Sequence, residues 1–428
     1  MNIKNPLRLA ILSVAILGFA SAIVVNILKI INADDYSEVD HLKMSIIPAD
    51  RGNIYTYDNQ LLAVNSLRYE LRFDGTYINP NTKELNILAL DLSKILKNKS
   101  KDAYLADLLK AQDNKYYLLK REISLSQIDK IKKIKFYQKP LHGGIIIQQH
   151  TIRKKPNLNS ASRTIGDLFK DDNTPIYGLE YSYNSELMGK NGKCLVLHEP
   201  GLDRKIDNAN NIEPESGLDL ITTLELDYQD ILEQALLRQL EKYEGDFGTA
   251  ILMEVNSGRI KAITNLQKTE SNKYAETLNF GVTHQIEPGS TFKTASIMAY
   301  FEDHHGNIND TIDCKNGEYT FEGASIATID HEKLGKVSIT EVIAHSSNIG
   351  IARLIKKYYQ NNPEGFINRI YNFGLGEKSK IDLIGIPKPD IKFPGDKSWS
   401  GVSLPWISYG YEISLTVLDI LTFYNTIA

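Results

Sequence analysis

The chain has 428 residues, with 49 basic against 53 acidic side chains and a net charge of −4. That length allows two or three domains, and the 42% hydrophobic and 24% charged fractions exclude a wholly disordered protein. The near balance of charge argues against nucleic acid as the main partner, because such partners favour a basic surface. The two cysteines, Cys194 and Cys314, cannot build a disulfide framework or a cysteine-based zinc site. One bridge between them stays open, but the sequence favours two free thiols.

The first element in chain order is an apolar run from Leu9 to Leu28 without a charged residue. About 20 apolar residues at about 1.5 Å each cross a hydrocarbon core of about 30 Å. Basic residues precede the run and acidic residues follow it, so the positive-inside rule places the N-terminus in the cytoplasm. We therefore expect a cytoplasmic tail and a single-pass anchor at 1–35, with the bulk of the chain outside. A cleaved signal peptide is the alternative, but the run continues past the cleavage-like Ala20-Ser21-Ala22.

Residues 36–212 combine extended runs with polar, lysine-rich helical patterns. Strands are predicted at Tyr69–Phe73 and Gly144–Gln149, and helices at Leu85–Asn98 and Ser124–Phe136. No compact catalytic group stands out in this stretch. We expect an elongated α/β pedestal domain that serves as a spacer or an interaction module.

A polar loop at Asp207–Glu215 marks the boundary to a second domain at 213–428. Strands gathered with many helices predict an α+β domain with a mostly antiparallel sheet, and an α+β class for the protein. The predicted elements at its start are a strand at Leu218–Thr223, an amphipathic helix at Asp227–Tyr243, and a β-hairpin of Thr249–Val255 and Ile260–Thr264.

The most specific chemical signal is the string Glu287-Pro288-Gly289-Ser290-Thr291-Phe292-Lys293. Pro-Gly makes a tight turn and a helical pattern follows from Thr291 to Phe301, so Ser290 falls at a helix N-terminus with Lys293 one turn later. A serine is a weak nucleophile until a base takes its proton, and a desolvated lysine can do so. The string therefore predicts Ser290 as nucleophile and Lys293 as general base. By itself, Ser-x-x-Lys is more typical of an N-capping serine with a solvated lysine, and it is the surrounding string that favours the catalytic interpretation.

A second candidate group lies in His345-Ser346-Ser347-Asn348. The hydroxyl of Ser346 can relay a proton, and the amide of Asn348 can orient the peptide group of a substrate. Ser-x-Asn taken alone is also typical of a helix or loop cap.

These strings resemble the class B penicillin-binding proteins, membrane-anchored D,D-transpeptidases that cross-link peptidoglycan and carry S-x-x-K and S-x-N motifs. The resemblance spans the chain from Arg51 to its end, although Thr223-Leu224-Glu225 stands where the family usually has T-I-D. The further similar strings are Arg51-Gly52-Asn53-Ile54 with Leu62-Ala63, Gly178-Leu179-Glu180 with Leu187 and Gly189-Lys190-Asn191-Gly192, Gly217 to Gln229, Trp406 to Gly410, and Ser414 to Ala428.

The resemblance implies a serine acyl-enzyme at Ser290 and a reaction without metal or organic cofactor. It implies peptidoglycan stem peptides ending in D-Ala-D-Ala as substrates, β-lactams as ligands, and no nucleic acid. Implied partners are the plasma membrane, a SEDS-type glycan polymerase and other division proteins. The strings Ser346–Gly350 and Trp406–Tyr411 look most like the division-specific branch, which implies a location at the septum. The elongation-specific branch shares most of these motifs and stays the alternative.

The third family motif, K-T/S-G, is missing from the sequence. Lys268-Thr269 and Lys293-Thr294 are followed by Glu270 and Ala295 instead of glycine. From Thr416 to Ala428 a helical apolar stripe runs to the last residue, where the family continues toward the motif strand. We therefore expect a transpeptidase domain truncated before its third motif, with divergence as the alternative, and an inactive chain in this form.

Two other functions fit part of the sequence. A non-catalytic envelope scaffold would use the anchor and the pedestal without Ser290. A β-lactamase or penicillin sensor would share S-x-x-K, but these families generally lack the R-G-x-I and G-x-E strings of the pedestal.

Overall fold

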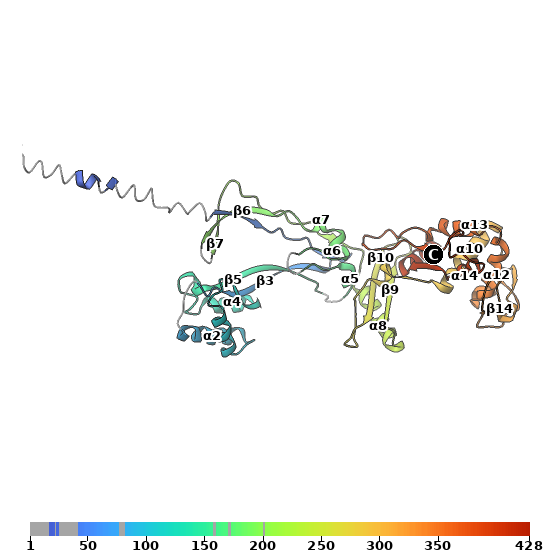
Figure 1. Ribbon diagram of the computed structural model, residues 1–428, viewed down its shortest axis with the longest axis horizontal. Coiled ribbons are helices and arrows are strands. Elements are labelled where there is room, and N and C mark those ends of the chain that lie inside the picture. The colour runs from blue at the N-terminus through green and yellow to red at the C-terminus, as the bar shows by residue number, and fades with distance from the viewer. Residues whose placement is uncertain are drawn as a thin grey trace, which may run out of the picture. The chain divides into compact units, whose positions relative to one another are not determined.

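The computed structural model describes residues 17–21, 23–24, 42–76, 82–156, 160–169, 173–199 and 202–428. The chain divides into two compact units, each assembled from three separate stretches (Figure 1). Helices and antiparallel strands occur in both, so the predicted α+β class is confirmed. Unit 1 takes the described residues of Met1–Arg51, Asn65–Ile152 and Met188–Gly217, and unit 2 those of Gly52–Val64, Arg153–Leu187 and Leu218–Ala428.

The predicted membrane anchor at Leu9–Leu28 lies mostly outside the described residues. Residues 17–21 and 23–24 are described and are helical. In the part of the chain that the structure describes, no helix is both long and apolar enough to cross a bilayer. The anchor stays a prediction from the sequence.

One core of unit 1 lies between strands and three helices. Strand β3 (Leu61–Phe73) pairs antiparallel with β4 (Tyr117–Ile123) through its second half, and β5 (Ile145–Lys154) also pairs with β3. The core is closed by α2 (Thr82–Leu96), α3 (Lys101–Lys110) and α4 (Leu125–Lys132).

The helices of this core follow their sequence patterns. On α2, Leu85, Leu88 and Leu92 recur at helical spacing and are fully buried. Helix α4 begins after Ser124, whose side chain and that of Gln127 form a capping box. The predicted helices and the two predicted strands of this region are therefore confirmed, although α4 ends four residues earlier than predicted.

A second sheet of unit 1 is antiparallel, with the order β1-β6-β7. Its strands are β1 (Leu42–Ile47), β6 (Gly192–Glu199) and β7 (Leu202–Ile206). The 3-10 turn η2 (Pro140–Gly144) precedes β5.

Unit 2 begins with short strands and a long helix packed on a hairpin. Strand β8 (Leu220–Ile221) pairs parallel with β2 (Ile54–Tyr55). Helix α8 (Leu226–Tyr243) lies against β9 (Phe247–Met253) and β10 (Ile260–Lys268), which form the predicted antiparallel hairpin (Figure 1). The buried Gln229 fastens the helix, because its amide both accepts from the N–H of Ile263 and donates to its carbonyl, each at 2.9 Å.

The rest of unit 2 is mainly helical around one large apolar core. Its longer helices α10 (Lys293–His304), α12 (Asn348–Tyr359) and α13 (Pro363–Ile370) each contribute three or four buried side chains, and α15 (Val417–Ile427) contributes Phe423. Its shorter helices are α5 (Ser162–Ile165), α6 (Gly178–Ser182), α7 (Asn184–Leu187), α9 (Phe280–Thr283), η3 (Gly289–Phe292), η4 (Lys315–Gly317), α11 (Ile339–Ala344), the π-type turn η5 (Tyr371–Leu375) and α14 (Ser403–Ser408). Its other strands are β11 (Tyr274–Ala275), β12 (Gln285–Ile286), β13 (Thr311–Asp313), β14 (Glu318–Tyr319), β15 (Thr328–Ile329), β16 (Lys336–Ser338), β17 (Asp390–Ile391) and β18 (Ile413–Thr416).

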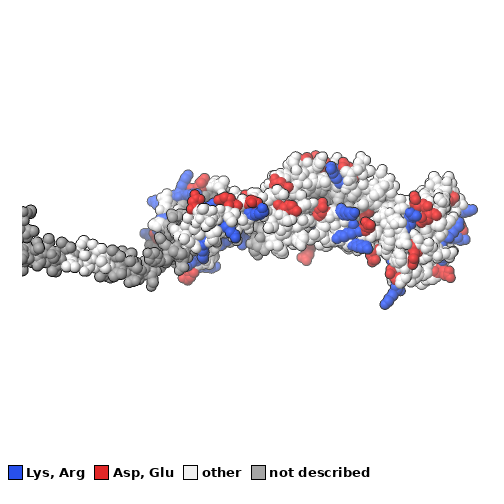
Figure 2. Space-filling view, turned by 90° about the horizontal axis from the view of Figure 1, so that it is seen from above, with Lys and Arg blue, Asp and Glu red and all other residues white. Residues whose placement is uncertain are grey.

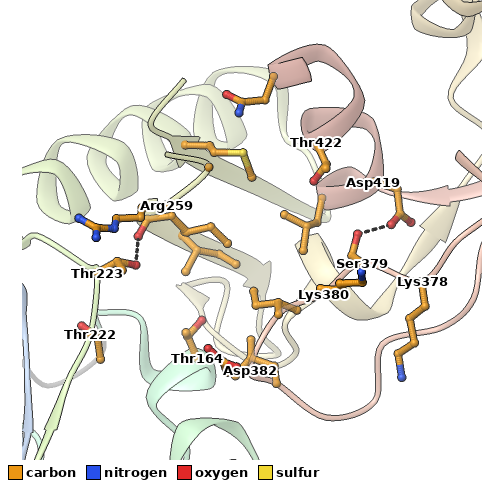
Figure 3. A pocket seen from close by; sticks show the side chains of 18 of the residues that line it. Thr164, Thr222, Thr223, Arg259, Lys378, Ser379, Lys380, Asp382, Asp419 and Thr422 are labelled. Carbon is orange, nitrogen blue, oxygen red and sulfur yellow. Dashed lines mark hydrogen bonds between the residues drawn. The ribbon is translucent and has the colours of Figure 1, made fainter. Parts of the chain in front are cut away.

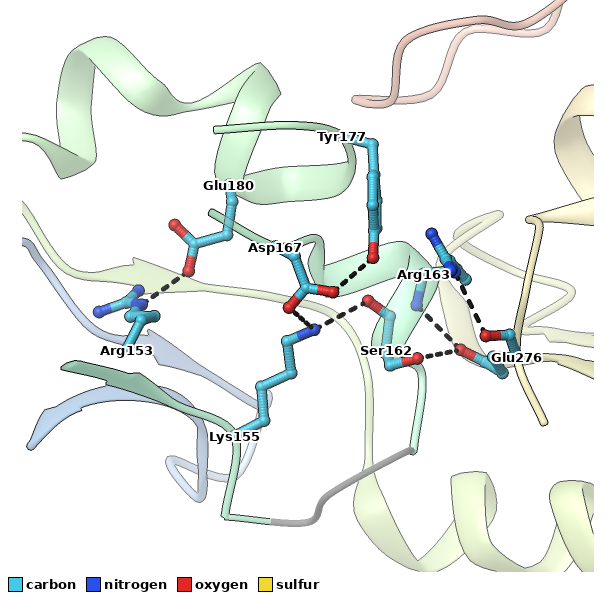
Figure 4. Close-up of polar contacts among 8 residues, drawn as sticks. All are labelled: Arg153, Lys155, Ser162, Arg163, Asp167, Tyr177, Glu180 and Glu276. Carbon is cyan, nitrogen blue, oxygen red and sulfur yellow. Dashed lines mark hydrogen bonds and ion pairs between the residues drawn. The ribbon is translucent and has the colours of Figure 1, made fainter. Parts of the chain in front are cut away.

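Polar contacts fix the 153–187 stretch internally, through Arg153 and Glu180, and join it to the rest of unit 2 through Glu276 (Figure 4). Arg153 and Glu180 form an ion pair at 2.7 Å with side chains only 8% and 1% exposed. The Glu276 carboxylate accepts hydrogen bonds from the hydroxyl of Ser162 (3.1 Å) and the backbone N–H of Arg163 (2.9 Å). Burial raises the pKa of Glu276 to about 7 against these donors. A carboxyl that titrates near neutrality therefore lies inside unit 2.

Acidic and basic side chains are interspersed on the face drawn in Figure 2. This matches the near balance of 49 basic and 53 acidic residues in the sequence. Cys194 and Cys314 are both buried and free, which confirms the expected free thiols.

Candidate active site

Ser290 lies in the tight turn that leads into α10. Gly289 has a φ of +55°, and the 3-10 turn Gly289–Phe292 precedes the α-helix that begins at Lys293. The helix predicted from Thr291 therefore begins at Lys293, after a 3-10 turn that contains Ser290, and such turns are frequent at the N-termini of α-helices. The side chain of Ser290 is exposed, and that of Phe292 is buried in the core. The turn thus anchors its apolar residue and presents its serine to solvent.

A second glycine holds the Ser290 turn in place. The N–H of Gly289 donates to the carbonyl of Gly410 at 3.1 Å. Gly410 has a φ of +93°, and a Cβ atom on it would lie 2.0 Å from the carbonyl oxygen of Gly289. On the other side, the Tyr424 hydroxyl donates to the carbonyl of Thr291 at 2.7 Å. Contacts from α15 and from the turn after α14 therefore fix the backbone around Ser290.

Lys293 is a buried amine with two acceptors. Its residue is 2% exposed, and its Nζ donates to the hydroxyl of Ser346 at 2.9 Å and to the carbonyl of Ser346 at 2.5 Å. Burial lowers the pKa of Lys293 to about 8, although the charge of Asp330 opposes this shift. A substantial share of this amine is therefore neutral in mildly alkaline solution, as a general base requires.

Ser346 lies in the connection between α11 and α12. Its φ is +52°, a conformation that non-glycine residues adopt rarely, and its N–H donates to the carbonyl of Ile343 at 3.0 Å. The residue is exposed, so its hydroxyl can contact both Lys293 and a molecule from solvent. The structure thus brings Lys293 and Ser346 into contact. The sequence separation of their two motifs could not have established this.

Asn348 is the first residue of α12. The preceding Ser347 is the N-cap, and its hydroxyl accepts from the N–H of Gly350 at 2.9 Å. Asn348 is half-buried, and within the described part of the chain its side-chain amide has no hydrogen-bond partner. That amide is available to a substrate's peptide group.

Sequence reasoning missed Asp330, a half-buried residue directly after β15. Its carboxylate accepts from the hydroxyl of Ser347 at 2.5 Å and from the N–H groups of Asn348 at 2.8 Å and Ile349 at 3.3 Å. No motif or periodic pattern marks this aspartate, since its importance comes from a loop that folds back onto α12.

The arrangement suits acyl transfer through a serine. The exposed hydroxyl of Ser290 lies one turn before the buried amine of Lys293, whose pKa is lowered. That amine also contacts the hydroxyl of Ser346. Among the described residues, no group of three or more His, Cys, Asp or Glu is arranged to hold a metal ion.

A cavity of about 670 Å³ lies elsewhere in unit 2 (Figure 3). Its walls come from β8, the β9–β10 turn, the loop after η5, and α15. The structure describes all four predicted site residues, and none of them lines this cavity: Ser290, Lys293, Ser346 and Asn348. Ser379 donates to the carboxylate of Asp419 at its edge. The cavity is therefore separate from the candidate active site.

Two family models match the chain. The model of the penicillin-binding protein dimerisation domain matches residues 46–222, and that of the penicillin-binding protein transpeptidase domain matches residues 248–428.

Relatives with known names or structures are similar over most of the chain. The peptidoglycan D,D-transpeptidase FtsI of Buchnera aphidicola subsp. Schizaphis graminum is 28% identical over 73% of this chain and 53% of its own length. Penicillin Binding Protein 2X of Streptococcus thermophilus is 22% identical with a TM-score of 0.69, covering 90% of this chain and 59% of that one. PBP2 of Helicobacter pylori, in a complex with MreC, is 18% identical with a TM-score of 0.66, covering 90% and 77%. The chain spans about half the length of the curated relatives it matches.

Proposed function

Because this chain belongs to the penicillin-binding proteins, with a dimerisation domain followed by a transpeptidase domain, we propose that it acts as a class B peptidoglycan D,D-transpeptidase. The observation that carries the proposal is the buried amine of Lys293, one turn after Ser290 and hydrogen-bonded to Ser346. A serine one helical turn before an amine of lowered pKa can supply a nucleophile and its base. The similarity to the peptidoglycan D,D-transpeptidase FtsI of Buchnera supports the same reaction.

In the proposed reaction, Ser290 Oγ attacks the carbonyl carbon between the two terminal D-alanines of a stem peptide. Its proton passes to the neutral Nζ of Lys293 while Asn348 orients the substrate's peptide group. The C–N bond breaks, D-alanine leaves with a proton delivered through Ser346, and an ester remains on Ser290. An amine of a neighbouring stem peptide then attacks the ester, which forms the cross-link and frees the serine. β-Lactams resemble the dipeptide and acylate Ser290 without an efficient exit.

The proposed organisation has three parts: a cytoplasmic tail and anchor at 1–35, a pedestal at 36–212 and a transpeptidase domain at 213–428. The uncharged apolar run at Leu9–Leu28 supports a single-pass position in the plasma membrane with the N-terminus in the cytoplasm. Protease added to intact spheroplasts should degrade everything beyond the anchor. Protection of the whole chain would contradict this topology.

We propose that the protein works at the division septum with a SEDS-type glycan polymerase and other division proteins. The Ser346–Gly350 string and the similarity to a relative named FtsI support this role. An elongation role is the second candidate, because the Helicobacter pylori protein of similar fold is PBP2 in a complex with MreC. A fluorescent fusion at native expression should gather at midcell during constriction. Uniform side-wall fluorescence would favour the elongation role.

Fluorescent penicillin applied to the complete gene product tests the reaction. The wild type should be labelled at one residue, and Ser290→Ala should abolish the label because it removes the hydroxyl that forms the acyl ester. Ser271→Ala is the matched control, since Ser271 is an exposed serine in the β10–β11 turn, and it should label like the wild type. If the Ser290→Ala variant is still labelled, Ser290 is not the nucleophile. An unlabelled wild type would favour a non-catalytic scaffold.

A chromogenic β-lactam separates the transpeptidase from a β-lactamase or penicillin sensor. The expected result is a stoichiometric burst followed by negligible turnover. Continuous hydrolysis would identify a β-lactamase instead.

A further inference from the structure

The second motif is held by a carboxylate that lies outside every motif string. The N–H of Asp330 donates to the carbonyl of Gly317 at 2.9 Å, which fixes the loop after β15. Its Oδ2 accepts from the hydroxyl of Ser347 at 2.5 Å, and its Oδ1 accepts from the N–H groups of Asn348 at 2.8 Å and Ile349 at 3.3 Å. Three donors at the start of the 12-residue helix α12 therefore converge on one side chain from another segment.

The position of α12 decides where both residues of the second motif lie. Ser346 and Asn348 flank Ser347, so any shift of Ser347 moves the hydroxyl that Lys293 contacts and the free amide beside it. Ser346 is also held at a φ of +52°, and a residue in that conformation needs support from its neighbours. The bonds to Asp330 supply this support on the α12 side.

The charge of Asp330 also reaches Lys293. Its carboxylate acts against the burial that lowers the pKa of Lys293, and it helps to raise the pKa values of the Cys314 thiol and the Tyr409 hydroxyl. These groups come from α10, from the residue after β13 and from the end of α14. Lys293 is the one cation among them, so it is the group that the carboxylate stabilises in its charged form.

We propose that Asp330 is a positioning residue of the active site, which keeps Ser346 and Asn348 aligned with Lys293 and provides the counter-charge for that lysine. The role rests on the proposed function, because it concerns the same nucleophile and base. Asp330 itself does not contact the reacting atoms.

The test is the rate of acylation by fluorescent penicillin between about pH 6 and 10 for the complete gene product. In the wild type, the rate should rise with pH as Lys293 loses its proton, with a midpoint near its pKa of about 8. Asp330→Asn removes the counter-charge, so the midpoint should move down by about one pH unit. The maximal rate should also fall about tenfold, because charge-assisted bonds to α12 become weaker.

Two further variants separate alignment from charge. Ser347→Ala removes one bond to the carboxylate and keeps the charge, so its rate should fall about fivefold or more with an unchanged midpoint. Glu318→Gln is the matched control, because Glu318 is an exposed carboxylate on β14, the strand that pairs with β15 just before Asp330. It should change neither the rate nor the midpoint.

A purely structural role for Asp330 would lower the melting temperature and leave the midpoint in place. An unchanged midpoint in folded Asp330→Asn therefore overturns the proposal. Where that variant does not fold, the acylation rate of Ser347→Ala tests the proposal, and a rate within twofold of the wild type overturns it.

Carbon-detected NMR of the Lys293 Cε resonance follows the same titration without acylation. Asp330→Asn must move that titration to lower pH even if an unlabelled wild type refutes the proposed function.

Discussion

At the scale of single residues, unit 2 holds two ionisable groups that are costly to bury. Lys293 is 2% exposed with a pKa lowered to about 8, and Glu276 is 8% exposed with a pKa raised to about 7. In both cases burial disfavours the charged form, so the folded state shifts each group toward neutrality. The lysine lies at the candidate active site, where a neutral amine is useful, and the glutamate lies against the 153–187 stretch.

Replacing Lys293 should increase stability and remove activity. The folded protein binds fewer protons than the unfolded chain between about pH 8 and 10.5, so burying the ammonium lowers the unfolding free energy at neutral pH. Lys293→Met keeps an unbranched apolar stem and should raise that free energy by roughly 1–3 kcal/mol at pH 7. Urea unfolding and fluorescent penicillin labelling measure the two effects. A destabilised variant would show that the bonds to Ser346 outweigh desolvation.

Glu276 should make the stability of the protein fall as pH rises. Its folded-state pKa of about 7 lies above the ordinary value of 4.5, so the stabilising contribution is complete below about pH 4.5 and is lost through pH 7. The loss should be roughly 3 kcal/mol. In Glu276→Gln, this decline in the urea-derived unfolding free energy should disappear from the pH profile. A parallel decline in both proteins would assign it to other groups.

At the scale of elements, the turn before α10 depends on the close approach of two glycines. A Cβ atom on Gly410 would lie 2.0 Å from the carbonyl oxygen of Gly289, next to the nucleophile. Gly395 has a similar backbone, with φ values of +102° against +93°, but nothing lies within 4 Å of its Cβ position. The pair separates steric clash from backbone strain.

Gly410→Ala should slow acylation about tenfold or more, because moving the Ser290 turn by about 1 Å misaligns the attack. Gly395→Ala should introduce only the strain of a positive φ, which lowers the unfolding free energy by about 1–2 kcal/mol. The variant should be labelled by penicillin at the wild-type rate. Labelling rates and melting temperatures of the two variants are compared. Equal labelling in both would remove Gly410 from the support of the site.

The sequence predicted long elements better than their ends. The helix predicted at Asp227–Tyr243 and the hairpin after it are present as α8, β9 and β10, because their apolar periodicity is buried in the fold. The strand predicted at Leu218–Thr223 shrinks to two residues, since its partner β2 offers only two for pairing. Asp330 was not predicted, because its partners at α12 lie 17 to 19 positions later, beyond the reach of any local helix or strand pattern.

At the scale of the molecule, the 153–187 stretch belongs to unit 2 although it lies in the predicted pedestal sequence. Its buried pair, Arg153 and Glu180, has side chains 8% and 1% exposed, whereas the surface pair Lys190 and Glu215 is 79% and 70% exposed. Both pairs have similar distances, of 2.7 and 2.8 Å. They therefore compare a buried Arg–Glu pair with an exposed Lys–Glu pair of similar length.

Glu180→Gln should lower the unfolding free energy by about 3 kcal/mol, because it removes a counter-charge from a buried guanidinium. Glu215→Gln should change it by less than about 1 kcal/mol, since water screens the exposed pair. Denaturant unfolding of both variants gives the comparison. Equal effects would mean that the buried pair has no special role in unit 2.

Because unit 2 is assembled from three separate stretches of the chain, it can fold only late in synthesis. The N–H of Asn53 donates to the carboxylate of Asp219 at 2.7 Å, and these residues are 166 positions apart. At about 5–20 residues per second, roughly 8–33 s of synthesis separate the two partners. During that interval β2 is made without β8, so its edge is open to mispairing. A nascent chain of this kind needs either a holding chaperone or delayed release, and unit 2 becomes protease-resistant only after its last stretch has emerged.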